Sequence, residues 1–164
     1  AARQVADARA EQEATEAQAA ALRKGTVTAT AAAAGSAEDA YLAQADAVCI
    51  RGWADGRVAF GKRPPREDRQ AYASWLEGVV GRGKETLRRW RARPVPRAID
   101  GEITTVLDRY RRGLAAYGTA ATWLAAGQTE EGDNLLRLGD QIGADYRRLA
   151  TRAGFRECDT ALPL

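Results

Sequence analysis

The sequence predicts an all-α protein, an antiparallel four-helix bundle preceded by a polar, alanine-rich N-terminal helix. Two observations support this fold class. Apolar residues recur every three or four positions in four consecutive segments, which is typical of the buried face of a helix. No segment shows the alternation of apolar and polar residues that indicates a strand. Because the connections between the four segments are short, we expect an up-and-down arrangement in which the first and fourth helices are also neighbours.

Residues 1–24 are rich in Ala, Glu, Gln and Arg, which are strong helix formers. Val5 and Leu22 are the only large apolar residues in this stretch, so the predicted helix has almost no apolar face to bury. We therefore expect an exposed arm or stalk. Residues 25–36 break the charge pattern and are interpreted as a linker, which leaves 37–164 for the bundle.

The first two bundle helices are delimited by capping residues, glycine and proline. Ser36 followed by Asp39 is typical of a helix start, and Gly61 with the Pro64-Pro65 pair ends the first helix. Pro94 and Pro96 close the second. The predicted apolar faces are Leu42, Ala45, Cys49, Trp53, Gly56 and Phe60 in the first helix, and Tyr72, Leu76, Val79, Gly83, Leu87 and Trp90 in the second.

The third and fourth helices are separated by Gly127, and Thr129 with two following glutamates opens the fourth. Gly154 ends it. The predicted apolar faces are Ile99, Ile103, Val106, Tyr110, Leu114, Tyr117, Ala121 and Leu124 in the third helix, and Leu135, Leu138, Ile142, Tyr146, Leu149 and Ala153 in the fourth.

The composition excludes several classes of active site. The chain has no histidine, which is the commonest general base and metal ligand, and its two cysteines alone cannot form an ordinary zinc site. The segment from Gly78 to Lys84 resembles a phosphate-binding loop, but Glu85 replaces the required Ser or Thr and the segment lies inside a predicted helix. Acids such as Asp46, Asp108 and Asp145 are expected to face water or pair with arginine. We therefore predict no catalytic residue, no metal and no cofactor.

Cys49 lies on the apolar face of the first bundle helix, and Cys158 follows the last helix by a few residues. A chain that reverses at Gly154 brings the second cysteine back toward the first, so the topology permits a disulfide. Such a bond would stabilise the fold by about 4 to 5 kcal/mol in the chain-entropy model. The alternative is two unconnected buried thiols in a cytosolic protein. We favour the disulfide, and with it an oxidising, extracytoplasmic compartment.

Two short motifs contain these cysteines: Ala45-Asp46-Ala47-Val48-Cys49, and Ala153-Gly154-Phe155-Arg156-Glu157-Cys158. Together they resemble a pattern in actinobacterial secreted or membrane-anchored small helical-bundle proteins of unknown function. The resemblance spans about residues 37 to 158 and implies a cysteine staple and an extracytoplasmic location, but no catalytic residues. The chain does not begin with methionine, so we expect any signal peptide or membrane anchor to lie upstream of Ala1.

The basic run Arg88, Arg89, Trp90, Arg91 and Arg93 is the best candidate contact surface, because arginine beside an exposed tryptophan binds anionic partners. The alternative, which we favour, is a helix C-terminus stabilised by cations, with Trp90 in the core. Lys24, Lys62 and Lys84 are the only lysines among the 25 basic residues. Codon bias in a GC-rich genome explains that imbalance more simply than a dedicated anion-binding surface.

The leading functional hypothesis is a non-catalytic interaction module of the cell envelope, secreted or membrane-tethered. Its partner is expected to be another envelope protein or an anionic envelope polymer, and membrane contact is expected only through a segment upstream of Ala1. One alternative is a cytoplasmic basic bundle that binds nucleic acid, which is less favoured. Another is a small-ligand sensor with a cavity between its helices.

Overall fold

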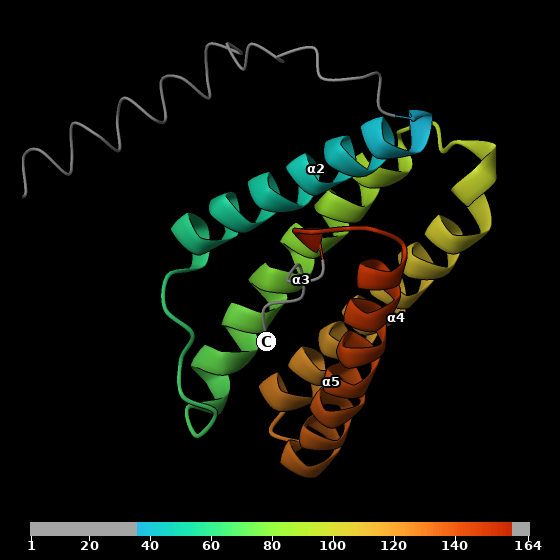
Figure 1. Ribbon diagram of the computed structural model, residues 1–164. Coiled ribbons are helices and arrows are strands. Elements are labelled where there is room, and N and C mark those ends of the chain that lie inside the picture. The colour runs from blue at the N-terminus through green and yellow to red at the C-terminus, as the bar shows by residue number, and fades with distance from the viewer. Residues whose placement is uncertain (1–35, 159–164) are drawn as a thin grey trace, which may run out of the picture. The chain divides into compact units, whose positions relative to one another are not determined.

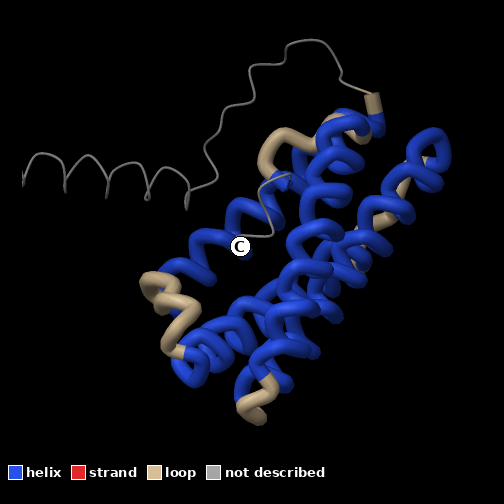
Figure 2. Tube along the Cα trace, turned by 90° about the horizontal axis from the view of Figure 1, so that it is seen from below, coloured by secondary structure: helices blue, strands red, loops and turns tan. Residues whose placement is uncertain are grey.

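The computed structural model describes residues 36–158, apart from the side chains of Trp53, Arg57 and Val58. The predicted arm and the rest of the linker lie outside the described residues. Within the described range the elements are helices, and none is a strand (Figures 1 and 2). In chain order they are α2 (Ala37–Phe60), α3 (Arg69–Arg91), the 3-10 turn η1 (Arg97–Ile99), α4 (Asp100–Ala125) and α5 (Thr129–Arg152). The prediction of an all-α helical bundle is confirmed.

The predicted helix boundaries at Ser36, Gly61, Gly127 and Gly154 are confirmed, and the structure adds a cap at Asp68. The backbone N–H of Asp39 donates to Ser36 Oγ at 3.2 Å, and the backbone N–H of Ser36 donates to Asp39 Oδ2 at 3.1 Å, which forms a reciprocal cap on α2. Asp68 caps α3 by accepting from the backbone N–H of Ala71 at 3.1 Å. Positive φ angles, which glycine adopts without strain, end three of the helices at Gly61, Gly127 and Gly154.

Each helix packs antiparallel against the next, and α2 and α5 make little direct contact with each other. Glycines set the closeness of these pairs. Along α2 and α3, Gly52 lies against Thr86 and, two turns later, Phe60 lies against Gly78. At Gly78 an added Cβ would fall 2.4 Å from the Phe60 ring. The sequence analysis placed the first and fourth helices as neighbours; in the structure they are joined instead by the segment that follows α5 (Figure 1).

The core has two parts. The first contains residues from all four helices and from the segment after α5, with Tyr41, Cys49, Trp90, Tyr110 and Tyr146 among its buried members. The second lies at the other end, and its described members come from α3, α4 and α5: Tyr72, Ala73, Leu76, Val80, Tyr117, Ala120, Ala121, Leu124 and Leu136. The C-terminal half of α2 packs on α3 through Gly52 and Phe60.

The predicted apolar face of α5 is confirmed at Tyr146, with Leu149 and Ala153 packed against the core, but it is wrong in the first half of the helix. Leu138 is 45% exposed, and Leu135 is only partly buried. The buried face instead consists of Gly132, Leu136, Gly139, Gly143, Tyr146 and Ala150. Three of these six are glycines, which lack the side chain that a search for apolar periodicity detects. Gly132 and Gly139 let α5 approach Leu124 and Tyr117 of α4 closely.

Candidate functional site

The predicted contact surface at the end of α3 loses its aromatic residue. Trp90 has no solvent exposure, its indole Nε1–H donates to Tyr41 Oη at 3.0 Å, and the Phe155 ring meets it edge-on with centroids 5.0 Å apart. The interpretation of Trp90 as an exposed contact residue is therefore wrong, and the core alternative is confirmed. Burial of so large a side chain with its one polar atom paired is a strong stabilising arrangement.

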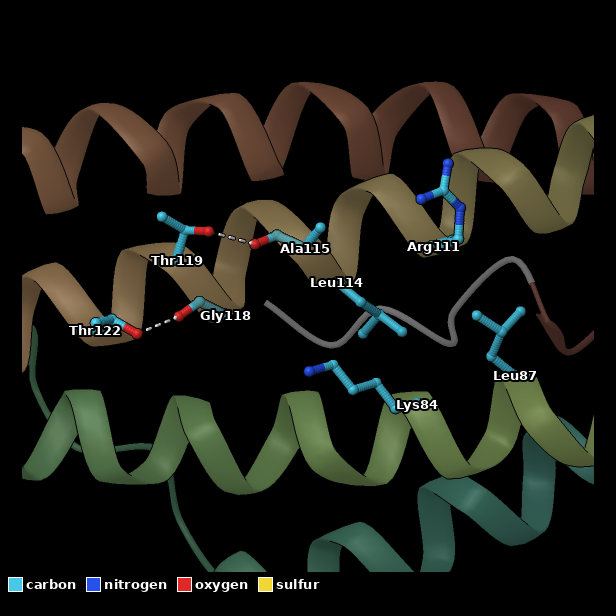
Figure 3. A pocket seen from close by; sticks show the side chains of 8 residues that line it. All are labelled: Lys84, Leu87, Arg111, Leu114, Ala115, Gly118, Thr119 and Thr122. Carbon is cyan, nitrogen blue, oxygen red and sulfur yellow. Dashed lines mark hydrogen bonds between the residues drawn. The ribbon is translucent and has the colours of Figure 1, made fainter.

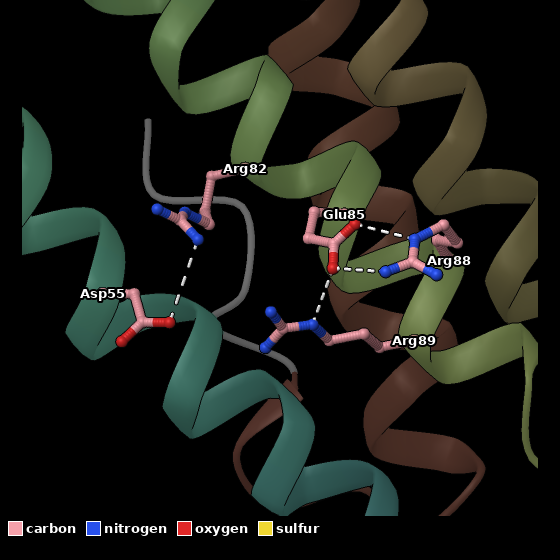
Figure 4. A network of polar contacts seen from close by, with 5 residues as sticks. All are labelled: Asp55, Arg82, Glu85, Arg88 and Arg89. Atoms are coloured by element: carbon pink, nitrogen blue, oxygen red, sulfur yellow. Dashed lines mark hydrogen bonds and ion pairs between the residues drawn. The ribbon is translucent and has the colours of Figure 1, made fainter.

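Two of the four candidate arginines share one counterion. Arg88 binds both carboxylate oxygens of Glu85, at 2.8 and 2.7 Å, and Arg89 Nε donates to Glu85 Oε1 at 2.8 Å (Figure 4). Hydrogen bonds from Arg88, and then from Arg89, lower the pKa of Glu85 to about 2. The same figure shows Arg82 of α3 reaching toward Asp55 of α2, at 3.9 Å. The charges of Glu85, Arg88 and Arg89 therefore sum to one net positive charge.

The remaining two candidate arginines behave differently. Arg93 Nη1 donates to Gln44 Oε1 at 2.8 Å, which ties the end of α3 to α2. Arg91 is exposed. The predicted surface is thus divided: Trp90 and Arg93 belong to the packing of α2 on α3, whereas Arg88 and Arg91 lie on the exposed side of α3. Lys84, a turn earlier at the same helical spacing, lies on this side as well.

That exposed side borders a groove of about 500 Å³ between α3 and α4, which is open toward solvent (Figure 3). Leu87 and Leu114 form its buried floor, and Gly118 and the exposed Ala115 continue it along α4. A cavity between helices was expected from the sequence only under the small-ligand alternative, with no residue assigned to it. The residues that line the groove are Lys84, Leu87, Arg111, Leu114, Ala115, Gly118, Thr119 and Thr122.

The polar groups of the groove are unequal in their availability. Thr119 and Thr122 donate their hydroxyl hydrogens to the backbone carbonyls of Ala115 and Gly118, at 3.1 and 3.2 Å, so only their lone pairs and methyl groups stay available. Arg111 Nη2 donates to Asp108 Oδ1 at 2.8 Å. The Lys84 side chain lies along the groove between the two helices (Figure 3), and no described carboxylate lies within ion-pairing distance of it. Lys84 is therefore the available cation of the groove.

A second polar arrangement, which the sequence analysis missed, lies where the chain returns to α2. Asp46 is only 8% exposed, and its carboxylate accepts hydrogen bonds from three consecutive backbone N–H groups: Arg156 at 3.1 Å, Glu157 at 3.0 Å and Cys158 at 3.1 Å. The expectation that Asp46 faces water or pairs with arginine is therefore wrong. Asp108 and Asp145 do pair with arginines, as expected.

Cys49 and Cys158 form the expected pair. Their sulfur atoms are 2.05 Å apart, their Cα atoms are 5.3 Å apart, and 109 positions separate them in sequence. Both residues are buried, and Tyr146 Oη donates to the carbonyl oxygen of Cys158 at 2.5 Å. The segment 153–158, shown in red in Figure 1, thus returns from α5 and is joined to α2 by one covalent bond and three hydrogen bonds to Asp46.

Burial also changes the pKa values of tyrosines in the core. Burial raises the pKa of Tyr110, and burial together with the charge of Asp140 raises that of Tyr117, whose hydroxyl donates to Asp140 Oδ1 at 3.0 Å. In the part of the chain that the structure describes, no three His, Cys, Asp or Glu residues cluster as a metal site. None of the described helices is long and apolar enough to cross a lipid bilayer.

Comparisons of the chain with protein-family models, with curated proteins and with solved structures found no match. The function is therefore inferred from the described residues alone.

Proposed function

We propose that this protein is a non-catalytic binding module that works outside the cytoplasm, in secreted or membrane-tethered form, and binds another envelope protein or an anionic envelope polymer. The observation that supports this most directly is the buried pair Cys49–Cys158, which joins α2 to the segment after α5. Disulfides of this kind persist in oxidising compartments and are rare where thiols are kept reduced.

The distribution of polar groups supports binding rather than catalysis. Glu85, Asp108 and Asp133 are bound by arginines, and Asp46 is occupied by backbone N–H groups. The groove between α3 and α4 offers a cation and an apolar floor but no nucleophile beside a base, which general acid–base and covalent mechanisms require.

Burial of Trp90 weakens the nucleic-acid alternative. Proteins that bind single strands stack bases on exposed aromatic rings beside their basic residues, and the aromatic residue of this basic run lies in the core. The arginines nearest to it are also partly neutralised by Glu85. We therefore favour a protein or an envelope polymer as the partner.

The compartment is tested in the organism that makes the protein. Cells are fractionated after free thiols have been blocked with an alkylating reagent, and the intact protein is weighed without reduction. We expect it outside the cytoplasm with no alkyl group on either cysteine. Recovery from the cytosol with Cys49 and Cys158 both alkylated would overturn the proposal.

A further inference from the structure

We propose that the groove between α3 and α4 binds an amphipathic helix of a partner protein, whose apolar face lies on Leu87 and Leu114 and whose flanking acidic residues meet Lys84 and its neighbouring arginines. This inference rests on the proposed binding function and names the surface and the kind of partner.

The dimensions of the groove suit a short helix. Its lining runs along α4 from Arg111 to Thr122, which is about 16 Å or three helical turns. A helix of that length presents apolar residues at positions i, i+3 or i+4, and i+7. The groove is also open along its solvent side, whereas sites for small molecules enclose most of their ligand.

Beyond Leu114 the wall of the groove on α4 consists of small residues. Ala115 is exposed, Gly118 has no side chain, and the two threonines turn their hydroxyl hydrogens back to their own helix. Gly81, on the exposed side of α3, has open space where a Cβ would stand, so no contact within the described residues requires a glycine there. The small residues on α4 let the backbone of a third helix approach closely, as glycines do between α4 and α5.

The charges around the groove determine which charge the partner helix must carry. Lys84 has no described carboxylate partner, and Arg88 and Arg91 continue the same exposed side of α3. On α4, Arg111 and Arg112 share the single carboxylate of Asp108. The rim of the groove is therefore net positive, and a helix that carries glutamates beside its apolar face is complementary to it.

The test uses the full-length oxidised protein, labelled with ¹⁵N, and two synthetic peptides. Both peptides are blocked amphipathic helices with leucines at i, i+3, i+7 and i+10; one has glutamates and the other lysines at the flanking positions. We expect the glutamate peptide to shift the amide signals of Lys84, Leu87, Ala115 and Gly118. Because two or more ion pairs are exchanged for repulsion, we expect its Kd to be at least about tenfold lower than that of the lysine peptide.

Matched variants assign the binding to the groove. Ala115→Leu fills it and Lys84→Glu reverses its available charge, so each should weaken binding of the glutamate peptide by about tenfold or more. Ala144→Leu and Lys62→Glu make the same changes at exposed positions on other parts of the bundle and should leave binding unchanged. An unchanged thermal transition in each variant shows that the fold is intact.

Three results would overturn the proposal: no shift of the groove amides at millimolar peptide, equal binding of the lysine peptide, or equal losses in the control variants. The proposal would also be overturned, in favour of those ligands, if dodecanoate or an anionic polysaccharide shifted the amide signals of the groove residues and the glutamate peptide did not. None of these results bears on the compartment, which the fractionation experiment tests separately.

Discussion

The backbone N–H of Cys158 donates a hydrogen bond to the carboxylate of Asp46, 3.1 Å away, so the residue that closes the disulfide is also positioned by a side chain three residues before its partner Cys49. The Asp46 carboxylate also accepts hydrogen bonds from the backbone N–H groups of Arg156 and Glu157. A single buried carboxylate therefore orders the short segment that brings Cys158 to α2.

Asp46→Ala should destabilise the protein by about 2 to 4 kcal/mol, because three backbone N–H groups lose a charged acceptor in a place with little access to water. Asp145→Ala, on an exposed side of α5, is the matched control and should cost less than about 1 kcal/mol. Urea denaturation measures both, and amide hydrogen exchange should accelerate at residues 156–158 in Asp46→Ala alone. Equal losses in the two variants would contradict this role for Asp46.

Replacing both cysteines with serine should lower the free energy of unfolding by about 4 kcal/mol, since the bond closes a long loop in the unfolded chain. The serine variant should keep its helical circular dichroism, because the hydrogen bonds to Asp46 and the contact of Phe155 with Trp90 do not depend on sulfur. Denaturation of the unmodified protein with and without a reducing agent gives an independent value. A loss below about 1 kcal/mol would show that the bond constrains little.

Trp90→Ala should cost about 3 to 5 kcal/mol, because the variant leaves a cavity among Tyr110, Phe155 and the unpaired hydroxyl of Tyr41. Trp123, which is 36% exposed on α4, provides the comparison: Trp123→Ala should cost about 1 kcal/mol or less. Chemical denaturation of the two variants checks the difference. Similar stabilities would mean that the basic end of α3 is not anchored through its tryptophan.

The helices could be predicted from the sequence because their ends are set by local chemistry. Ser36, Gly61, Gly127 and Gly154 act through their own backbone or an adjacent turn, so their effect is readable without knowledge of the fold. The order of the helices and the reversal at Gly154 permitted a pairing of the two cysteines, although two free thiols remained the alternative. The segment after α5 lies on α2 as expected, but α5 itself, which was expected beside α2, makes little contact with it.

The buried face of α5 and the role of Asp46 could not be predicted, for two different physical reasons. The glycines Gly132, Gly139 and Gly143 of α5 are buried, and large side chains of α4 cover the first two of them. The pattern of apolar residues within α5 therefore does not reveal this face. A buried carboxylate looks like any surface acid until its partners are known, and the partners of Asp46 are backbone groups more than a hundred positions away. The groove depends likewise on which sides of α3 and α4 stay uncovered.

Alanine substitutions at two glycines should therefore have opposite effects. At Gly139 a Cβ would fall 2.5 Å from the ring of the buried Tyr117, so Gly139→Ala should destabilise the protein by about 1 to 3 kcal/mol despite alanine's better helix propensity. At Gly81 the space is open, so Gly81→Ala should stabilise α3 by about 0.5 to 1 kcal/mol. Thermal unfolding of both variants measures the signs, and a stabilising Gly139→Ala would contradict the close packing of α4 and α5.

The buried tyrosines make the fold sensitive to alkaline pH. Burial raises the pKa of Tyr110 and Tyr117 above the ordinary value of 10.0, with Asp140 adding to the effect at Tyr117. The folded state therefore retains phenol protons that the unfolded chain releases. Their contribution to stability is complete below pH 10.0 and decreases as the pH rises above that value, by about 1.4 kcal/mol per pH unit for each tyrosine.

Tyr117→Phe separates this effect from other alkaline changes, because phenylalanine has no proton to release. Above pH 10 the free energy of unfolding should fall less steeply in the variant than in the unmodified protein, and the two slopes should differ by about 1.4 kcal/mol per pH unit. At neutral pH the variant should be less stable, because it lacks the hydrogen bond from Tyr117 to Asp140. Urea denaturation at a series of alkaline pH values, with tyrosinate absorbance recorded in parallel, measures both slopes. Parallel slopes, or tyrosinate absorbance from all five tyrosines of the folded chain near pH 10, would mean that Tyr117 ionises without unfolding and is not enclosed between α4 and α5.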